Sequence, residues 1–238
     1  MLKLVGFDGD DTLWHSEGYY REANDAFARI LGRYADLTDD AVHDTMLETE
    51  RRNLALFGYG AKGMTLSMVE TAIAVSGRRI TADDIHRVIE LGKRVLRHPV
   101  ELLPGIRECV EAVATQYDMV LITKGDLFHQ EQKVAQSGLA GWFRRIEIVS
   151  EKSAACYRRV LAGFDRTPSQ FVMVGNSLRS DIEPVVRLGG WGVHLPYEVT
   201  WAHELEHGLD EGHDHVVSVS DPSAIVGALE LLAARAGS

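Results

Sequence analysis

The pattern of apolar and polar positions divides the chain into stretches of different character. Residues 2–7 form a short apolar run that ends in acidic residues, which is typical of a buried strand. Residues 16 to about 97 instead repeat apolar side chains at helical spacing and contain no convincing strand. Thr38 and Thr81 each precede acidic residues and then apolar periodicity, as helix N-caps do. We therefore expect an all-helical lobe after the first strand.

From Pro104 onward, short apolar runs alternate with segments of helical periodicity. The expected strands are 119–122, 146–149, 171–174 and 191–195, and the expected helices are 105–115, 126–137, 153–163 and 178–188. Such alternation predicts the α/β class, with a doubly wound parallel sheet that helices cover on both faces. The expected domains are a core of residues 1–14 and 98–238 and an inserted helical cap of residues 15–97.

Composition and charge narrow the choice of partners. The chain of 238 residues has 25 basic and 35 acidic side chains, a net charge of −10, and shows no basic stripe of the kind that binds nucleic acid. No run of roughly 18 apolar residues occurs, so no membrane span is expected. Cys109 and Cys156 do not form a CxxC pair, which favours a reducing, cytoplasmic setting. An anionic substrate would need local cations in order to bind.

Polar side chains follow several of the expected strands. The sequence Asp8-Gly9-Asp10-Asp11-Thr12 follows the first strand, and Thr123-Lys124-Gly125-Asp126 follows the second. Lys152 follows the third strand, and Gly175-Asn176-Ser177 with Asp181 follows the fourth. In parallel α/β sheets, ligands bind beyond the carboxyl ends of the strands. We therefore expect these groups to converge on one pocket.

The types of residue in this set suit the transfer of a phosphoryl group. Two close carboxylates, Asp8 and Asp10, repel each other, and this cost suggests a bound cation. Mg²⁺ prefers oxygen ligands and binds through one or two carboxylates plus substrate phosphate, so Asp181 can supply another ligand. Lys152 can neutralise phosphoryl charge, and Thr123 can donate a hydrogen bond to it. An aspartate can form a phosphoaspartyl intermediate, while a second carboxylate handles the proton.

The run Asp8-Gly9-Asp10-Asp11-Thr12-Leu13 resembles the DxDxT motif of the haloacid dehalogenase-like superfamily. Thr123, Lys152 and the segment from Gly175 to Asp181 resemble its second, third and fourth motifs, and the similarity covers nearly the whole chain. The resemblance implies a Rossmann-like core and a helical-bundle cap. It also implies that Asp8 is the nucleophile and a magnesium ligand. By the same motif, Asp10 is the general acid/base, and its backbone carbonyl also binds the metal.

The resemblance further implies that Thr123 and Lys152 hold the phosphoryl oxygens and that Asp181 anchors the metal. Lys124 is a rival for the phosphate-binding lysine. We favour Lys152 because it opens a helix, whose N-terminus attracts anions, and we keep both lysines as candidates.

Three positions depart from the usual pattern of the superfamily. The fourth motif more often begins Gly-Asp, whereas Asn176 stands here; its amide oxygen can still bind a metal or its water, but one negative charge is lost. Asp11 stands where glycine is frequent, and we assign it no catalytic role. Gly9 is smaller than the usual apolar residue, which predicts extra room beside the nucleophile.

A second motif points to a different chemistry. His203-Glu204-Leu205-Glu206-His207 matches the HExxH signature of zinc proteases, and His213 falls where an extended version has its third histidine. However, Asp210 replaces the glycine of the extended form, and nearby glycines weaken a helix. We interpret the stretch as an acidic surface segment and leave adventitious metal binding open.

The function expected from these features is Mg²⁺-dependent hydrolysis of a small phosphorylated metabolite, such as a sugar phosphate or nucleotide, through a phosphoaspartate at Asp8. The chain is expected to be a monomer or homodimer. Three alternatives remain. A phosphomutase shares all four motifs, and a non-catalytic binding protein with a decayed site would be consistent with Asn176. A dehalogenase is disfavoured because the dehalogenases lack the second aspartate, Asp10.

Overall fold

The structure is a computed structural model that describes residues 1–198, 208–209 and 212–237. The chain forms two compact units, one of Met1–Glu17 with Val100–Ser238 (the core unit) and one of Gly18–Pro99 (the lobe). These boundaries lie within three residues of the expected ones. No helix among the described residues is long and apolar enough to cross a membrane.

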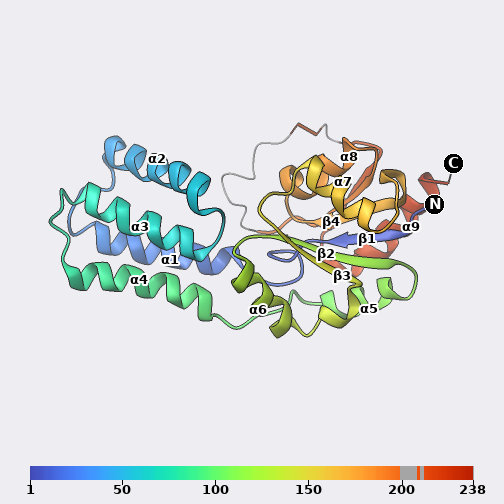
Figure 1. Cartoon of the computed structure of the whole chain (residues 1–238), viewed down its shortest axis with the longest axis horizontal. Coiled ribbons are helices and arrows are strands. Elements are labelled where there is room, and N and C mark those ends of the chain that lie inside the picture. Colours follow the sequence, from blue (N-terminus) through green and yellow to red (C-terminus); the bar gives the residue numbers. More distant parts are fainter. Residues whose placement is uncertain (199–207, 210–211, 238) are drawn as a thin grey trace. The chain divides into compact units, whose positions relative to one another are not determined.

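The core unit is built on a six-stranded sheet in which all paired strands are parallel (Figure 1). The strands are β1 (Leu4–Phe7), β2 (Asp118–Lys124), β3 (Arg145–Val149), β4 (Phe171–Gly175), β5 (Trp191–His194) and β6 (Val216–Ser218). Their order is β3-β2-β1-β4-β5-β6. The order reverses between β1 and β4, and in sheets of this kind ligands bind at that switch point, beyond the strand ends. The predicted doubly wound parallel sheet is therefore confirmed.

Alternating side chains of the strands bury apolar surface on both faces of the sheet. Val5 and Phe7 of β1 belong to the apolar cluster that includes residues of α5 (Ile106–Ala114) and α9 (Ile225–Arg235). Leu4 belongs to the opposite cluster, which includes residues of α7 (Ala154–Gly163) and α8 (Glu183–Val186). Burial on both faces explains why β1 appears as a continuous apolar run rather than as an alternating one.

Side-chain caps fix the starts of the two core helices nearest the expected site. Asp126 accepts a hydrogen bond from His129 N at the start of α6 (Leu127–Ser137). Ser153 accepts one from Cys156 N at the start of α7. Because the caps satisfy backbone N–H groups that otherwise lack partners, each helix begins directly after a strand end and a short loop. Short 3₁₀ turns lie at Ala140–Trp142, Pro168–Gln170 and Pro222–Ala224.

The expected helix over 178–188 is partly wrong. A π-type turn spans Leu178–Ile182, and only Glu183–Val186 is α-helical. The N–H groups of Asp181 and Ile182 both point at the carbonyl of Ser177, at 2.9 and 3.3 Å. This wide turn is the segment that carries Asp181, and π-type turns occur frequently at functional sites. The strand β6 and the helix α9 were not predicted.

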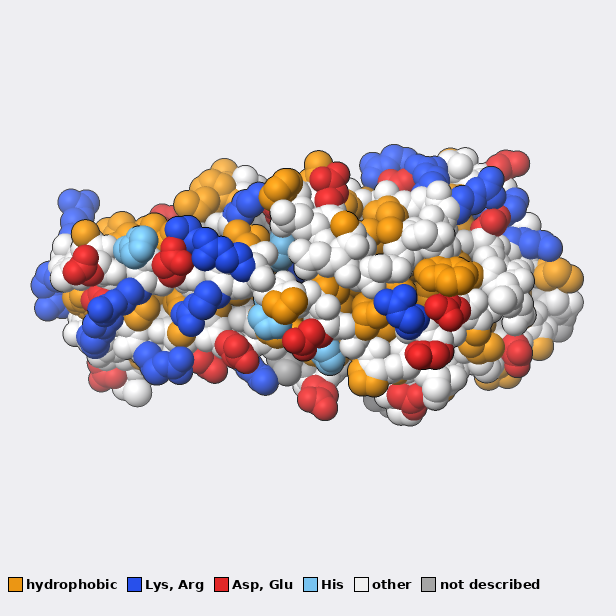
Figure 2. Space-filling model, turned by 90° about the horizontal axis from the view of Figure 1, so that it is seen from below, with side chains coloured by type: hydrophobic (Ala, Val, Ile, Leu, Met, Phe, Trp, Pro, Cys, Tyr) orange, Lys and Arg blue, Asp and Glu red, His pale blue; other side chains and the backbone are white. Residues whose placement is uncertain are grey.

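The lobe consists of four helices, α1 (Glu17–Leu31), α2 (Asp40–Phe57), α3 (Ala61–Val75) and α4 (Ala82–Arg97) (Figure 1). Glu17, the first residue of α1, belongs to the core unit. The buried apolar side chains of the lobe come from α1, α3 and α4 and include Phe27, Met68 and Leu91. Thr81 caps α4 as predicted, whereas the cap of α2 is Asp39 rather than Thr38. On the face shown in Figure 2, acidic and basic side chains are interspersed.

Candidate active site

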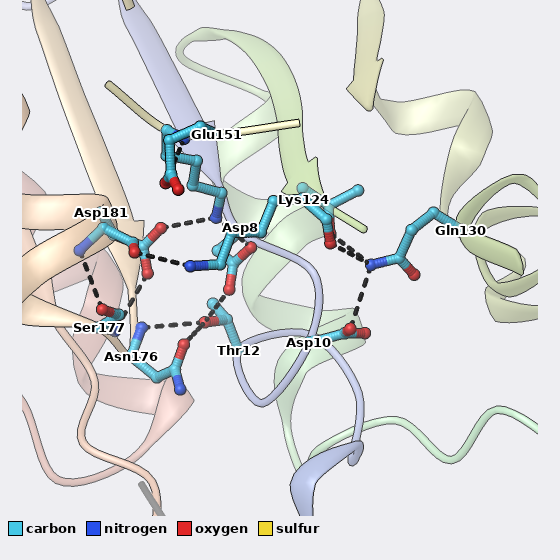
Figure 3. Close-up of polar contacts among 12 residues, drawn as sticks. Asp8, Asp10, Thr12, Lys124, Gln130, Glu151, Asn176, Ser177 and Asp181 are labelled. Carbon is cyan, nitrogen blue, oxygen red and sulfur yellow. Dashed lines mark hydrogen bonds and ion pairs between the residues drawn. The ribbon is translucent and has the colours of Figure 1, made fainter. Parts of the chain in front are cut away.

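Three charged side chains meet beyond the carboxyl ends of the strands. Figure 3 labels two of them, Asp8 and Asp181. Asp8 directly follows β1, Lys152 directly precedes the cap of α7, and Asp181 lies on the π-type turn after β4. Lys152 Nζ donates to Asp8 Oδ1, and it donates to Asp181 Oδ1 at 2.6 Å. All three side chains are buried. The strand-end residues Asp8, Lys152 and Asp181 therefore lie together, as the parallel sheet requires.

Burial and mutual charge interactions shift the pKa values of Asp8 and Lys152. Burial raises the pKa of Asp8 to about 7, and repulsion from Asp181 adds to the increase, while Lys152 opposes it. Burial would lower the pKa of Lys152, but the two carboxylates outweigh that effect and raise it. The lysine therefore stays protonated. With both carboxylates ionised, the three groups carry one net negative charge, which favours a further cation.

Thr12 and Asn176 add two oxygens beside Asp8. The Thr12 hydroxyl lies 3.4 Å from Asp8 Oδ2 and 3.4 Å from Asn176 Oδ1, and it accepts a hydrogen bond from Asn176 N at 3.1 Å. Asp181 Oδ2 accepts a hydrogen bond from Ser177 N at 3.0 Å, which fixes that carboxylate. The Thr12 hydroxyl thus connects the loop after β1 to the loop after β4. This role was not predicted from the sequence.

The Asp10 carboxylate does not join Asp8 and Asp181. Lys133 Nζ lies 2.8 and 2.9 Å from its two oxygens, and Trp14 Nε1 donates to Oδ1 at 2.6 Å. Gln130 Nε2 donates to Oδ2 at 3.1 Å (Figure 3). Burial alone would raise the pKa of Asp10, but the charge of Lys133 and the hydrogen bonds from Lys133, Trp14 and Gln130 hold it below its usual value.

The loop that carries Asp10 is closed over Gly9, and the extra room predicted there is absent. The N–H groups of Leu13 and Trp14 point back at the Gly9 carbonyl, at 2.8 and 3.3 Å. The indole ring of Trp14 fills the space beside Gly9, since a Cβ at Gly9 would lie 2.7 Å from that ring. Trp14 is almost fully buried. The packing of the Trp14 ring therefore requires a residue without a side chain at position 9.

Asp11 adopts a left-handed backbone conformation with φ of 62°, which explains why glycine suits this position and why Asp, which tolerates that region, is accepted. Its carboxylate accepts hydrogen bonds from the N–H groups of Ser16 and Glu17 at the start of α1, at 2.8 and 3.1 Å. Burial raises the pKa of Asp11 to about 7. The side chain thus has a structural role.

The two candidate phosphate-binding residues on β2 lie at its carboxyl end. Thr123 Oγ1 accepts a hydrogen bond from Gln130 Nε2 at 3.0 Å, and Lys124 Nζ donates to Ser180 Oγ at 2.9 Å. Lys124 is partly exposed, whereas Lys152 is buried. The structure therefore places both candidate lysines at the site, Lys152 against the carboxylates of Asp8 and Asp181 and Lys124 at the rim.

The donor set fits Mg²⁺ in its chemistry. Asp8, Asp181 and Asn176 offer side-chain oxygens, and the shared Thr12 contact brings Asp8 and Asn176 close to each other. Oxygen ligands with an excess of negative charge are those that Mg²⁺ takes. Among the described residues, no three His, Cys, Asp or Glu side chains come together as a metal site. The amide of Asn176 and the main chain of Asp10 would therefore have to complete the set.

Lys133 and Gln130 were missed by sequence reasoning, and no role was assigned to Trp14 as a partner of Asp10. Gln130 and Lys133 lie three residues apart on α6, so they share one helix face. Both are polar yet buried, at 2% and 8% exposure. A polar pair at helical spacing, one turn after the Thr123 segment, was the available signal.

The HExxH-like stretch, with His203 and His207, lies outside the described residues. Of its neighbours, His215 stacks on Trp191 with ring centroids 4.0 Å apart and hydrogen bonds to the Gly190 carbonyl. The ring of His213 contacts that of His215 edge-on, at 5.6 Å between centroids. His215 is therefore a packing residue at the edge of the sheet.

Comparison with known proteins decides the family. The family model described as haloacid dehalogenase-like hydrolase matches residues 2–189. The chain belongs to this family. This haloacid dehalogenase-like hydrolase is 52% identical to a haloacid dehalogenase-like family hydrolase from Xanthomonas campestris, with a TM-score of 0.90, over 99% of this chain and 98% of that one. A search of curated proteins found no match.

More distant structures share the fold of the haloacid dehalogenase-like hydrolase. A predicted phosphoglycolate phosphatase from Haemophilus somnus is 19% identical, with a TM-score of 0.62, over 96% of this chain and 98% of that one. A 2-haloacid dehalogenase from Pseudomonas syringae is also 19% identical, with a TM-score of 0.64, over 97% and 99%. Proteins named for different reactions share this fold, so the reaction of this chain has to be inferred from the residues of its site.

Proposed function

We propose that this haloacid dehalogenase-like hydrolase is a Mg²⁺-dependent phosphomonoesterase that acts on a small phosphorylated metabolite. The observation that carries the proposal is the second carboxylate. Asp10 lies two residues beyond the nucleophile candidate, and its side chain has its own hydrogen-bonding partners, separate from those of Asp8. A dehalogenase has no leaving oxygen to protonate, whereas phosphate-ester cleavage needs a proton donor of this kind.

The proposed reaction has two steps. In the first, an Asp8 carboxylate oxygen attacks phosphorus, the bond to the leaving oxygen breaks, and Asp10 gives that oxygen a proton. In the second, water attacks the phosphoaspartate while Asp10 takes its proton, and inorganic phosphate leaves with Asp8 restored. Asp10 is ionised at rest, and the negative charge of an incoming phosphate raises its pKa towards the acid form.

The other residues bind and neutralise charge. Lys152 holds Asp8 in place and supplies positive charge beside the phosphoryl oxygens, while Thr123 and Lys124 offer a hydroxyl and an ammonium at the end of β2. Asp8, Asn176, Asp181 and the main chain of Asp10 would hold Mg²⁺. When bound, the metal supplies charge neutralisation for the phosphoryl group.

The test is a phosphate-release screen over phosphorylated sugars, nucleotides and p-nitrophenyl phosphate, with Mg²⁺ and with EDTA. We expect release that depends on Mg²⁺ and is lost in Asp8→Asn, because an amide cannot act as the nucleophile. Asp118→Asn is the matched control, since Asp118 pairs with Arg144 at the opposite end of β2, and it should leave activity unchanged.

Halide release from 2-haloacids, together with no phosphate release from any substrate, would overturn the proposal.

A further inference from the structure

The Asp10 carboxylate lies among three donors from two elements, and the family comparison assigns a role to none of them. We propose that Lys133, Trp14 and Gln130 are positioning residues that aim the Asp10 carboxylate for proton transfer to the leaving group. The inference rests on the proposed phosphoesterase function, in which Asp10 is the acid. The three residues act through Asp10 and need not touch the substrate.

Lys133 makes the strongest of these contacts. Its ammonium lies 2.8 and 2.9 Å from the two Asp10 oxygens and 3.3 Å from Ser16 Oγ, and the side chain is 10% exposed. A buried ammonium is costly unless it is paired. A contact with both oxygens fixes the rotation of the carboxylate as well as its location. Loss of Lys133 therefore removes the main restraint on Asp10.

Trp14 adds a directional restraint. The indole has a single N–H donor, which points at Asp10 Oδ1 at 2.6 Å. The ring has little freedom, because it is buried against Gly9 and because the main chain pairs Asp11 N with Trp14 O at 2.7 Å. The donor is therefore built into the same loop as the acid that it orients.

Gln130 connects Asp10 to the phosphate-binding segment. Its amide nitrogen faces Asp10 Oδ2 at 3.1 Å, Thr123 Oγ1 at 3.0 Å and the Lys124 carbonyl at 2.8 Å. An amide nitrogen carries two hydrogens, so one of the three acceptors can be released without leaving a donor unsatisfied. Asp10 makes the longest contact. We therefore expect the Gln130 contact to matter least and the Lys133 contact to matter most.

A misplaced acid and a damaged fold have different kinetic signatures. A poor leaving group, such as the alkoxide of benzyl phosphate, needs a proton, whereas p-nitrophenolate leaves without one. Misplacement of Asp10 therefore slows the first substrate selectively, while a general loss of structure slows both. The parameter to compare is kcat/KM, which covers the steps from free enzyme up to the phosphorylation of Asp8.

The experiment measures kcat/KM for benzyl phosphate and p-nitrophenyl phosphate, with saturating Mg²⁺, in wild type, Lys133→Met, Lys133→Arg and Trp14→Phe. Because positioned acid catalysis contributes about 10²–10⁴-fold, we expect Lys133→Met to lose about tenfold or more on benzyl phosphate. The loss on p-nitrophenyl phosphate should be under about threefold. Lys133→Arg should keep part of the activity on benzyl phosphate that Lys133→Met loses. Trp14→Phe, which keeps a ring over Gly9, should lose less activity on benzyl phosphate than Lys133→Met does.

Arg144→Met is the control, since Arg144 pairs with Asp118 at the far end of β2, and it should affect neither substrate. Equal losses on both substrates in Trp14→Phe, or no loss in any variant, would overturn the inference. If Lys133→Met does not fold, the comparison of kcat/KM on the two substrates in Trp14→Phe and Lys133→Arg tests the inference instead.

A different result would show that the proposed function itself is wrong. In that case, wild type releases no phosphate from any substrate of the screen, or Asp8→Asn keeps full activity, and the inference falls with it. An active wild type with an inactive Asp8→Asn and uniform losses in the other variants overturns the positioning role alone.

Discussion

At the scale of single residues, Gly9 and Trp14 form a matched pair in the loop after β1. The indole ring lies where a side chain at Gly9 would be, and its N–H reaches Asp10. A larger residue at position 9 would push the ring away and break the contact with the acid. The absence of a side chain at Gly9 therefore leaves the space that Trp14 needs in order to contact Asp10.

We expect Gly9→Ala to destabilise the core unit by about 1–3 kcal/mol, as overpacking does, and to lower turnover. The added Cβ would lie 2.7 Å from the Trp14 ring and 3.1 Å from Thr123 Oγ1. Urea unfolding and tryptophan fluorescence measure the two effects. Gly227→Ala on α9 is the control, because a Cβ there meets nothing within 4 Å, and a helical alanine should be neutral or stabilising. An unchanged fluorescence spectrum in Gly9→Ala would contradict the expected displacement of the ring.

The residues at the strand ends could be foreseen, and those on the helix face could not. Asp8, Lys152 and Asp181 meet because parallel strands end at one edge of the sheet, and this rule needs only the positions of the strands. The contact of Lys133 with Asp10 depends on the rotation of α6 about its axis and on the folded-back loop. A single sequence does not specify that combination.

At the scale of elements, one buried carboxylate joins the helix α4 to the segment that follows α1. Asp84 on α4 accepts hydrogen bonds from Tyr34 OH at 2.5 Å, Arg33 at 2.7 Å and Arg87 at 3.0 Å. Arg33 and Tyr34 follow the end of α1. The hydrogen bond from Tyr34, with smaller effects of Arg33 and Arg87, holds the pKa of Asp84 below its ordinary value.

Asp84 therefore stabilises the lobe in a pH-dependent way. Because its pKa is lower in the folded state, the stabilisation is present above the unfolded pKa of about 3.9 and is lost as the pH falls through the folded value. We expect Asp84→Asn to be destabilised at pH 7 and to differ less from wild type at pH 3. Urea unfolding at both pH values measures the gap, with exposed Asp83→Asn as the control. A gap that widens in acid would contradict the expectation.

Elements with a strong apolar pattern were predictable, and those that depend on tertiary context were not. The strands β1 to β5 and the helices α5 to α7 lie within a few residues of the expected ranges because the strands are short apolar runs and the helices repeat apolar side chains at helical spacing. The π-type turn at Leu178–Ile182 was missed, since it follows from the hydrogen bonds of Ser177 and the placement of Asp181. Local periodicity does not encode either.

At the scale of the whole molecule, binding of the proposed Mg²⁺ would be linked to folding stability. Any ligand that binds only the folded chain stabilises it. Lys152 pairs with the two carboxylates of Asp8 and Asp181, and Asn176 adds an oxygen beside them without adding charge. A third carboxylate at that position would repel its neighbours when no metal is bound and would attract Mg²⁺ more strongly.

We therefore expect Asn176→Asp to bind Mg²⁺ roughly tenfold more tightly, since a unit charge 4 Å away is worth about 4 kcal/mol at an effective dielectric constant of 20, less the cost of burying the new charge. In EDTA the variant should melt below wild type, and in excess Mg²⁺ above it. Calorimetric titration and thermal melts measure the two effects. A variant that binds Mg²⁺ no more tightly than wild type would reject the expectation.

The two chain segments that connect the core unit to the lobe are held to each other by main-chain hydrogen bonds. His15 N bonds to Glu101 O at 2.9 Å, and Leu103 N bonds to Leu13 O at 3.0 Å. The lobe is thus inserted at a single closed junction, whose hydrogen bonds belong to the core unit. An insertion of this kind can be exchanged by recombination without disturbing the register of the sheet. Such an exchange would leave the strand-end residues Asp8, Lys152 and Asp181 in place, because all three belong to the core unit.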